Sequence, residues 1–144
     1  MDANLSGIHM MLPTPFDSQG NLERDSIPKL VALAERAGCS GVVCLGEMGE
    51  HSRLSEGERD SIVVAVIDAA GGRLKVTVGA TGQSTYTALR NVEQAQTYGA
   101  DAVMVAPPLA RKPNLEAVYD YYQAINARSI TLIIQDFPET NGVF

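Results

Sequence analysis

Acidic and imidazole side chains gather in the segment that follows the second apolar run of the sequence. Glu47, Glu50 and His51 are close neighbours there, and Asp136 follows a later apolar run. Carboxylate oxygens and imidazole nitrogens can bind metals or move protons. Their spacing matches no metal-ligand motif, so we expect no metal site. We expect Glu50 to hold the segment by accepting backbone N–H bonds, and Glu47 to be either a solvated carboxylate or a substrate contact.

The same segment, Gly46-Glu47-Met48-Gly49-Glu50, has a second chemical capability. The backbone N–H groups of Met48 and Gly49 could bind a carboxylate. Glu47 would place a negative charge beside such an anion, which costs about 1 kcal/mol or more at about 4 Å even in water. Gly79 to Gly82 lacks the Lys-Ser/Thr of a phosphate-binding loop, and the sequence has no complete dinucleotide fingerprint. We therefore expect a small-molecule substrate and no cofactor.

Composition excludes other classes of partner. The chain of 144 residues has a net charge of −6, which disfavours a nucleic-acid partner because phosphate backbones attract clustered Lys and Arg. No window approaches the about 20 apolar residues of a membrane span, and residues 1–7 do not resemble a secretory signal. We expect a cytoplasmic protein with no membrane partner. Cys39 and Cys44 lack zinc-site spacing and are interpreted as buried apolar residues.

Short runs rich in Val and Ile alternate with longer segments of helical period, and this alternation is typical of βα units with a parallel sheet. The expected strands are 7–12, 41–45, 74–78, 102–106 and 130–134, and the expected helices are 26–37, 55–70, 84–98 and 115–127. The fold class is therefore α/β. A free-standing doubly wound sheet and the first half of an eight-stranded barrel both satisfy this pattern.

Helix ends and several single residues have a structural interpretation. Ser55 with Glu58 three residues later has the spacing of a capping box. The expected first helix carries an apolar stripe from Ile27 to Ala37 and stops at Gly38. We interpret His9 as a hydrogen-bonded core residue. The tyrosines of the fourth helix, which are Tyr119, Tyr121 and Tyr122, are interpreted as packing or interface residues.

Seven short motifs recur in a characteristic order along residues 7–142. They are LPTPF at 12–16, GEMGE at 46–50, LSEGER at 54–59, VGAT at 78–81 with ST at 84–85, GADAVMV at 99–105, PP at 107–108 with KP at 112–113, and FP at 137–138 near Gly142. Together they resemble the family of dihydrodipicolinate synthase, N-acetylneuraminate lyase and the sugar-acid dehydratases.

The resemblance implies a (β/α)8 barrel, with residues 1–144 as the N-terminal part of one barrel domain: four βα units and strand five. It implies a lysine on strand six that forms a Schiff base with pyruvate or another 2-keto acid. It also implies a homo-oligomer. Lys29, Lys75 and Lys112 fall on a helix, near the start of strand three and in a loop, so none matches that nucleophile.

Seven residues at four functional sites depart from the family pattern. Glu47 and Met48 stand where much of the family has two threonines, and Gln135 and Asp136 stand where it has a proton-relaying tyrosine and an asparagine. Leu109-Ala110 replaces paired tyrosines, and Thr140 stands where synthases present an arginine for the second substrate. The resemblance places Glu47, Met48 and Gly49 at the substrate and Gln135 at the catalytic position, without the synthase's own relay.

Two functions of different classes follow. The chain is expected to be part of a synthase-like lyase or aldolase, or of a sugar-acid dehydratase, that acts on a 2-keto acid through a lysine beyond this sequence. The alternative is a non-catalytic remnant or interaction protein that keeps the half-barrel scaffold. A third interpretation is a free-standing α/β domain that binds a small anion at its strand ends. Either form of half-barrel would leave open sheet edges that favour pairing.

Overall fold

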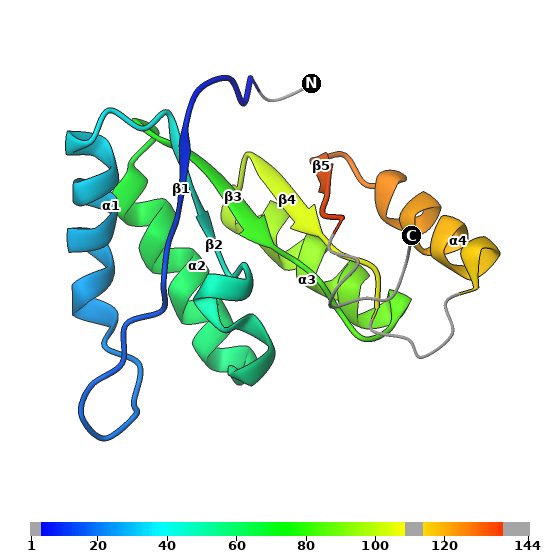
Figure 1. The fold of residues 1–144 in the computed structure, drawn as a ribbon, viewed down its shortest axis with the longest axis horizontal. Helices are drawn as coiled ribbons and strands as arrows, with labels where there is room; N and C mark the ends of the chain where they lie inside the picture. Colours follow the sequence, from blue (N-terminus) through cyan, green and yellow to red (C-terminus); the bar gives the residue numbers. More distant parts are fainter. Residues whose placement is uncertain (1–3, 109–113, 137–144) are drawn as a thin grey trace.

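A five-stranded parallel sheet with four helices forms the chain, as seen in a computed structural model that describes residues 4–108 and 114–136 (Figure 1). Leu109-Ala110, Lys112 and Thr140 lie outside the described residues. The strands are β1 (His9–Met11), β2 (Gly41–Cys44), β3 (Lys75–Gly79), β4 (Ala102–Val105) and β5 (Thr131–Ile134). The helices are α1 (Ile27–Arg36), α2 (Glu56–Ala70), α3 (Thr85–Tyr98) and α4 (Leu115–Asn126). The predicted α/β alternation is confirmed.

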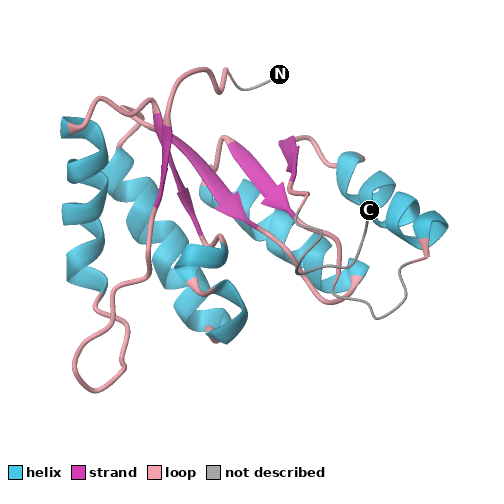
Figure 2. Cartoon of the chain, viewed as in Figure 1, coloured by secondary structure: helices cyan, strands magenta, loops and turns pink. Residues whose placement is uncertain are grey.

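The strands are hydrogen-bonded in the order β1-β2-β3-β4-β5, and every neighbouring pair is parallel. A doubly wound sheet reverses its strand order at a switch point, and this sheet does not. Parallel crossovers are almost always right-handed, so strands laid down in sequence place all their helices on one face. Figure 2 shows the helices on that face and the strands on the other. The chain therefore has the architecture of a half-barrel.

Each strand presents alternate residues to the helices and to the uncovered face. Val42, Val76 and Val103 are fully or almost fully buried against the helices, in a core that also contains Ile27, Val66, Val92 and Ile125. The register aligns Val43 with Thr77 and Thr77 with Ala102, and these residues face the other way. Hydrophobic burial against the helices thus defines the outer face of the half-barrel, and the uncovered face becomes its interior.

Several local predictions need correction. Strand β1 is shorter than 7–12 because Gly7 has a left-handed φ of +103° and cannot continue the strand. Ala37 is exposed, since the buried stripe of α1 consists of Ile27, Val31 and Ala34. Cys44 is buried as expected, and burial raises the pKa of its thiol to about 12. Cys39 is only half-buried and packs at the margin of the core.

Three short 3₁₀ turns went unpredicted: η1 (Arg24–Ser26), η2 (Glu47–Gly49) and η3 (His51–Arg53). Turns of this length carry no apolar periodicity that a sequence pattern could reveal. Two of them occupy the segment after β2 that holds the candidate site residues. No helix in the described part of the chain is long and apolar enough to cross a membrane.

The capping box at the start of α2 is present as predicted. Ser55 Oγ accepts a hydrogen bond from the Glu58 N–H, and the Glu58 carboxylate accepts from the Ser55 N–H at 2.8 Å. At the other end, Gly71 closes the helix with a left-handed φ of +53°.

We expect Ser55→Ala to lower the free energy of unfolding by about 1 kcal/mol, because the first turn of α2 loses its side-chain acceptor. Urea unfolding followed by circular dichroism measures the difference. Ser52→Ala is the matched control, since Ser52 is exposed and caps no helix in the described structure. Equal destabilisation by both variants would contradict the capping role.

The same box predicts a pH dependence. Hydrogen bonds from the side chain and backbone of Ser55 hold the pKa of Glu58 below its ordinary value of 4.5. A carboxyl whose pKa is lower in the folded state stabilises the fold above its unfolded pKa, and this stabilisation is lost as the pH falls through the folded pKa. We therefore expect the stability difference between the wild type and Ser55→Ala to shrink below about pH 4.5. Urea unfolding at neutral and acidic pH tests this, and an unchanged difference would contradict it.

Candidate functional site

The segment after β2 is held in an unusual backbone conformation. Leu45 and Glu50, which bracket it, have positive φ angles of 56° and 53°. Residues other than Gly, Asn and Asp rarely adopt this left-handed backbone conformation. Backbone strain of this kind clusters at functional sites. Between them the chain closes as η2, with the Gly49 N–H donating to the Gly46 carbonyl at 2.9 Å. The loop is thus a tight, strained turn at the carboxyl end of a buried strand.

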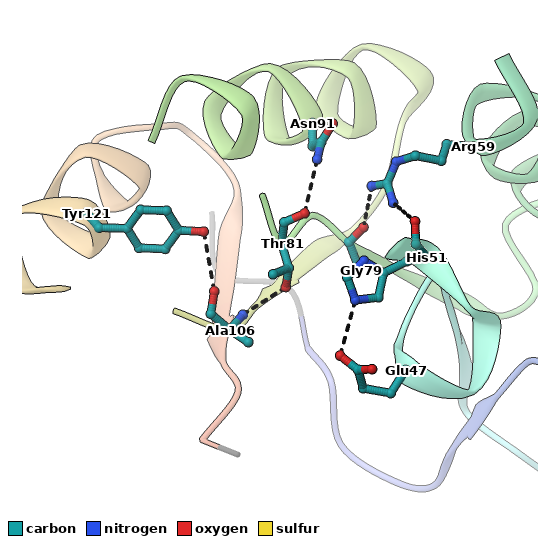
Figure 3. A network of polar contacts seen from close by, with 8 residues as sticks. All are labelled: Glu47, His51, Arg59, Gly79, Thr81, Asn91, Ala106 and Tyr121. Atoms are coloured by element: carbon teal, nitrogen blue, oxygen red, sulfur yellow. Dashed lines mark hydrogen bonds and ion pairs between the residues drawn. The ribbon is translucent and has the colours of Figure 1, made fainter. Parts of the chain in front are cut away.

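Two side chains from other elements fasten this loop. The buried Thr14 hydroxyl donates to the Gly49 carbonyl at 2.6 Å, which ties the turn to the loop after β1. From α2, Arg59 donates to the His51 carbonyl at 3.2 Å and to the Gly79 carbonyl at 3.1 Å (Figure 3). Burial lowers the pKa of Arg59, although a guanidinium remains charged at neutral pH. Arg59 therefore joins the ends of β2 and β3.

The ends of β2 and β3 also approach each other closely through their backbones. A Cβ on Gly79 would lie 1.8 Å from the Leu45 carbonyl oxygen, so this position admits glycine alone. The close approach brings the strained turn after β2 against the last residue of β3.

The network continues to β4 through the loop after β3. The Thr81 hydroxyl accepts a hydrogen bond from the Ala106 N–H at 3.0 Å, and Asn91 of α3 donates to the Thr81 carbonyl at 3.2 Å. On the other side, the Tyr121 hydroxyl of α4 donates to the Ala106 carbonyl at 3.3 Å. Figure 3 shows these contacts in one continuous series across the strand ends. They connect the segments after β3 and β4 to each other and to helices α3 and α4.

Glu47 and His51 form a pair on the turn. Glu47 Oε1 lies 3.2 Å from His51 Nε2, with the histidine buried and the Glu47 side chain 48% exposed. Glu47 is therefore partly solvated, and it has an imidazole partner that the sequence analysis did not assign. The Glu50 carboxylate accepts from the Arg53 guanidinium at 2.8 Å, whereas a backbone donor was expected. Within the described residues, no three His, Cys, Asp or Glu side chains form a group that could hold a metal.

The two backbone N–H groups that were predicted to bind a carboxylate differ in whether they are already hydrogen-bonded. The Gly49 N–H is engaged with Gly46, whereas the Met48 N–H has no hydrogen-bond partner in the described chain. The Met48 side chain is 60% exposed. Of the two donors, the Met48 N–H is the one that is not engaged within the described chain.

Gln135 follows β5 at the same end of the sheet as this turn. Its N–H donates to the Val105 carbonyl at 2.9 Å, so its backbone continues the parallel pairing with β4. Strands β3 and β4 lie between Gln135 and the turn after β2. Asp136, the next residue, is exposed. The predicted residues thus lie at the carboxyl ends of the strands, but they follow strands that are not neighbours.

The described lysines lie away from the carboxyl ends of the strands. Lys75 is the first residue of β3, at the opposite end of the sheet, where it pairs with Asp101 at 2.6 Å. Lys29 is exposed on α1. Neither lies at the carboxyl ends of the strands.

His9 differs from its interpretation as a hydrogen-bonded core residue. It is half-buried, and its Nε2 atom is buried without a hydrogen-bond partner among residues 4–108 and 114–136. The half-barrel interior is uncovered on this side, so β1 offers the imidazole no second layer of polar groups.

Arg59, Thr81 and Asn91 were not recognised as site residues from the sequence. Arg59 and Thr81 belong to motifs that carry the family resemblance, LSEGER and VGAT, and this was the only available signal. Their contacts join segments that are distant in the sequence, such as Arg59 with Gly79.

Comparison with known proteins decides the family. The sequence matches the dihydrodipicolinate synthetase family over residues 4–143. The chain belongs to that family. Among curated relatives of this family, the 4-hydroxy-tetrahydrodipicolinate synthase of Stutzerimonas stutzeri is 35% identical over 135 residues, which are 93% of this chain and 46% of the relative. That of Thermotoga maritima is 32% identical over 138 residues, or 95% and 47%.

Solved structures of the dihydrodipicolinate synthetase family confirm the fold. The dihydrodipicolinate synthase of Acinetobacter baumannii complexed with pyruvate superposes with a TM-score of 0.93 at 30% identity, over 97% of this chain and 48% of that one. The Thermotoga maritima enzyme gives a TM-score of 0.89 at 32% identity, over 95% and 46%. The chain spans about half the length of these relatives. It therefore corresponds to the N-terminal half of their barrel, as predicted.

We expect Arg59→Lys to lower the free energy of unfolding by about 1–3 kcal/mol, because one ammonium cannot replace both bonds of the guanidinium and leaves a buried carbonyl unpaired. Hydrogen exchange of residues 46–53 should become faster. Arg53→Lys is the control, since the Arg53–Glu50 pair is exposed and such pairs contribute about 0–1 kcal/mol. Unchanged exchange in Arg59→Lys would contradict the anchoring role.

Proposed function

We propose that this chain is the N-terminal half of a single-domain (β/α)8 lyase or aldolase that acts on a 2-keto acid through a lysine Schiff base, with the lysine outside these 144 residues. The observation that supports it most directly is the strained turn after β2, which has a free Met48 N–H at the strand ends. Active sites of (β/α)8 barrels lie at that end. The proposed chemistry needs no cofactor.

Met48 and Glu47 would define one side of the substrate. The Met48 N–H would donate to the keto-acid carboxylate, with the Gly49 backbone closing the turn beneath it. Glu47 would lie beside that anion, where its negative charge opposes a second anionic group. A hydroxyl-bearing substrate could instead donate a hydrogen bond to Glu47. This favours a sugar acid over a substrate with two carboxylates.

Gln135 would act differently from the tyrosine that the family usually has at this position. An amide cannot exchange a proton with an imine, so Gln135 would orient a water or a keto oxygen by hydrogen bonding. The acid–base step would then fall to another group. This departure is the reason to propose a dehydratase or another lyase of the family in place of the synthase.

The proposal includes the setting of the protein. Imine chemistry on a small keto acid suits a cytoplasmic enzyme, and the acidic net charge of −6 gives no basis for a nucleic-acid partner. The family resemblance of the sequence motifs implies a homo-oligomer, which we include in the proposal.

Borohydride trapping tests the placement of the lysine. We expect the 144-residue chain, incubated with pyruvate and borohydride, to keep its mass of 15.4 kDa, because its two described lysines, Lys29 and Lys75, lie away from the carboxyl ends of the strands. The protein produced from its natural gene should instead gain one pyruvyl adduct. Intact-mass spectrometry measures both.

The control replaces Lys29, Lys75 and Lys112 with Arg in the natural protein, and the adduct should persist. Loss of the adduct in this variant would place the nucleophile inside the present sequence and contradict the proposal. A natural protein that gains no adduct from pyruvate or from a panel of 2-keto acids would favour the non-catalytic scaffold, for which the Gln135 and Glu47 departures already argue.

A further inference from the structure

The carboxylate of Glu47 and the imidazole of His51 meet on the turn after β2 (Figure 3). His51 Nε2 lies 3.2 Å from Glu47 Oε1, and an ionised carboxylate can only accept, so Nε2 carries the hydrogen of this bond. The second oxygen, Glu47 Oε2, has no hydrogen-bond partner among residues 4–108 and 114–136. The His51 side chain is 10% exposed and that of Glu47 is 48% exposed. A buried imidazole thus supports a carboxylate that a ligand can reach.

The backbone fixes the position of this pair. Glu50 lies between the two residues in the sequence, and its left-handed φ of +53° separates η2 from η3. The four-residue spacing of the pair is therefore not that of a regular helix. From α2, the half-buried Arg59 donates to the His51 carbonyl at 3.2 Å. The imidazole is thereby held at its own peptide, and the carboxylate is held by the imidazole.

The turn begins at the mouth of the barrel interior. A Cβ on Gly46 would lie 2.5 Å from Met11 Sδ and 3.4 Å from Met104 Cε. Both methionines face the interior, because Met11 is aligned with Val43 and Met104 lies two residues after Ala102. The acidic residue that follows Gly46 therefore lies at the entrance to the interior, at the carboxyl ends of the strands, where active sites of this fold are found.

A keto acid bound at the Met48 N–H would lie beside Glu47, the preceding residue of the same turn. The carbon next to the keto group is only two bonds from the carboxylate carbon, so the atoms that react stay close to the group that binds the carboxylate. The His51 N–H also offsets part of the Glu47 charge, which lessens the repulsion between Glu47 and the carboxylate of the ligand.

Other titratable side chains around this position are poorly suited to accept a proton. The Glu50 carboxylate is paired with a neighbouring guanidinium at 2.8 Å. The hydroxyls of Tyr121 and Tyr122 donate to backbone carbonyls, and burial raises the pKa of both, that of Tyr121 to about 12, so they remain protonated. Asp136 is exposed, and after burial and Tyr121 it contributes to the raised pKa of Tyr122 on α4, so its charge acts on the helix side of the sheet. Glu47 combines an unpaired oxygen with a place on the turn itself.

We propose that Glu47 moves the proton in the imine chemistry of this site and that His51 is its positioning residue. The role rests on the proposed function, because the imine is formed with a lysine outside this sequence. Glu47 Oε2 accepts a proton from the carbon next to the iminium carbon. The C–H electron pair becomes the C=C bond of an enamine, and the C=N π electrons move to the nitrogen and neutralise it. The reverse step returns the proton from the Glu47 carboxyl group.

Deuterium exchange into pyruvate distinguishes this proton transfer from imine formation. In deuterium oxide, the natural protein should replace the methyl hydrogens of pyruvate by deuterium, which proton NMR follows, and borohydride trapping measures the imine in the same sample. We expect Glu47→Gln to lower the exchange rate at least about 100-fold, the usual contribution of a positioned acid–base group, and still to form the trapped adduct. Glu50→Gln is the matched control, since it makes the same change on the same turn at a carboxylate already paired with Arg53. Its exchange should be unchanged.

Further variants distinguish a chemical role from a structural one. Glu47→Ala should regain exchange when formate is added, because formate supplies the missing carboxylate and the 48% exposed position is open to it. A misfolded turn would not respond to formate. His51→Gln keeps an N–H donor close to the position of Nε2 and should retain more exchange than His51→Leu. Circular dichroism confirms that each variant is folded.

The outcomes distinguish this role from the proposed function. Wild-type exchange in an adduct-forming Glu47→Gln protein would overturn the role and leave the proposed function intact. Loss of the adduct in a folded Glu47→Gln protein would overturn it as well, because Glu47 would then serve binding. A natural protein that forms no adduct with pyruvate or with any 2-keto acid of the panel would overturn the proposed function, and the role of Glu47 with it.

Discussion

Parallel pairing of the strands in chain order is the constraint on which the rest of the structure depends. Each right-handed crossover returns its helix to the same face, so four crossovers bury one face and leave the other without a helical layer. The same pairing brings the carboxyl ends of all the strands to the same end of the sheet, where the candidate site lies. The core, the site and the open interior are consequences of a single topology.

The strand ends are held together by side chains that bind backbone carbonyls of neighbouring loops. Arg59 joins the segments after β2 and β3, and Thr81 joins those after β3 and β4. These bonds offset the strain of the left-handed Leu45 and Glu50, which a loop without anchors would relieve by changing its conformation. Contacts from Thr14 and Arg59 thus maintain the shape of this turn.

The described residues form about half of the barrel found in their relatives. The turn after β2 and Gln135 after β5 lie at the carboxyl ends of the strands. Within the described chain, the interior between them is bounded by strands on one side only. His9 Nε2 and Thr77 Oγ1 are buried without a hydrogen-bond partner in the described chain, and an apolar groove of about 410 Å³ lies beside Ile134. In the proposed barrel, the remaining residues would cover this side of the sheet.

The sequence was enough to predict the alternation of strands and helices, the capping box of Ser55 and Glu58, the end of α3 at residue 98, and the family, because these depend on local periodicity and short motifs. It left open the choice between a doubly wound sheet and a half-barrel. The tertiary structure decided that choice, along with the 3₁₀ turns after β2, the bridging role of Arg59, the Glu47–His51 pair and the unpaired His9. Each of these depends on contacts between residues that the chain brings together only when its strands pair, and no local pattern encodes which strand edge meets which.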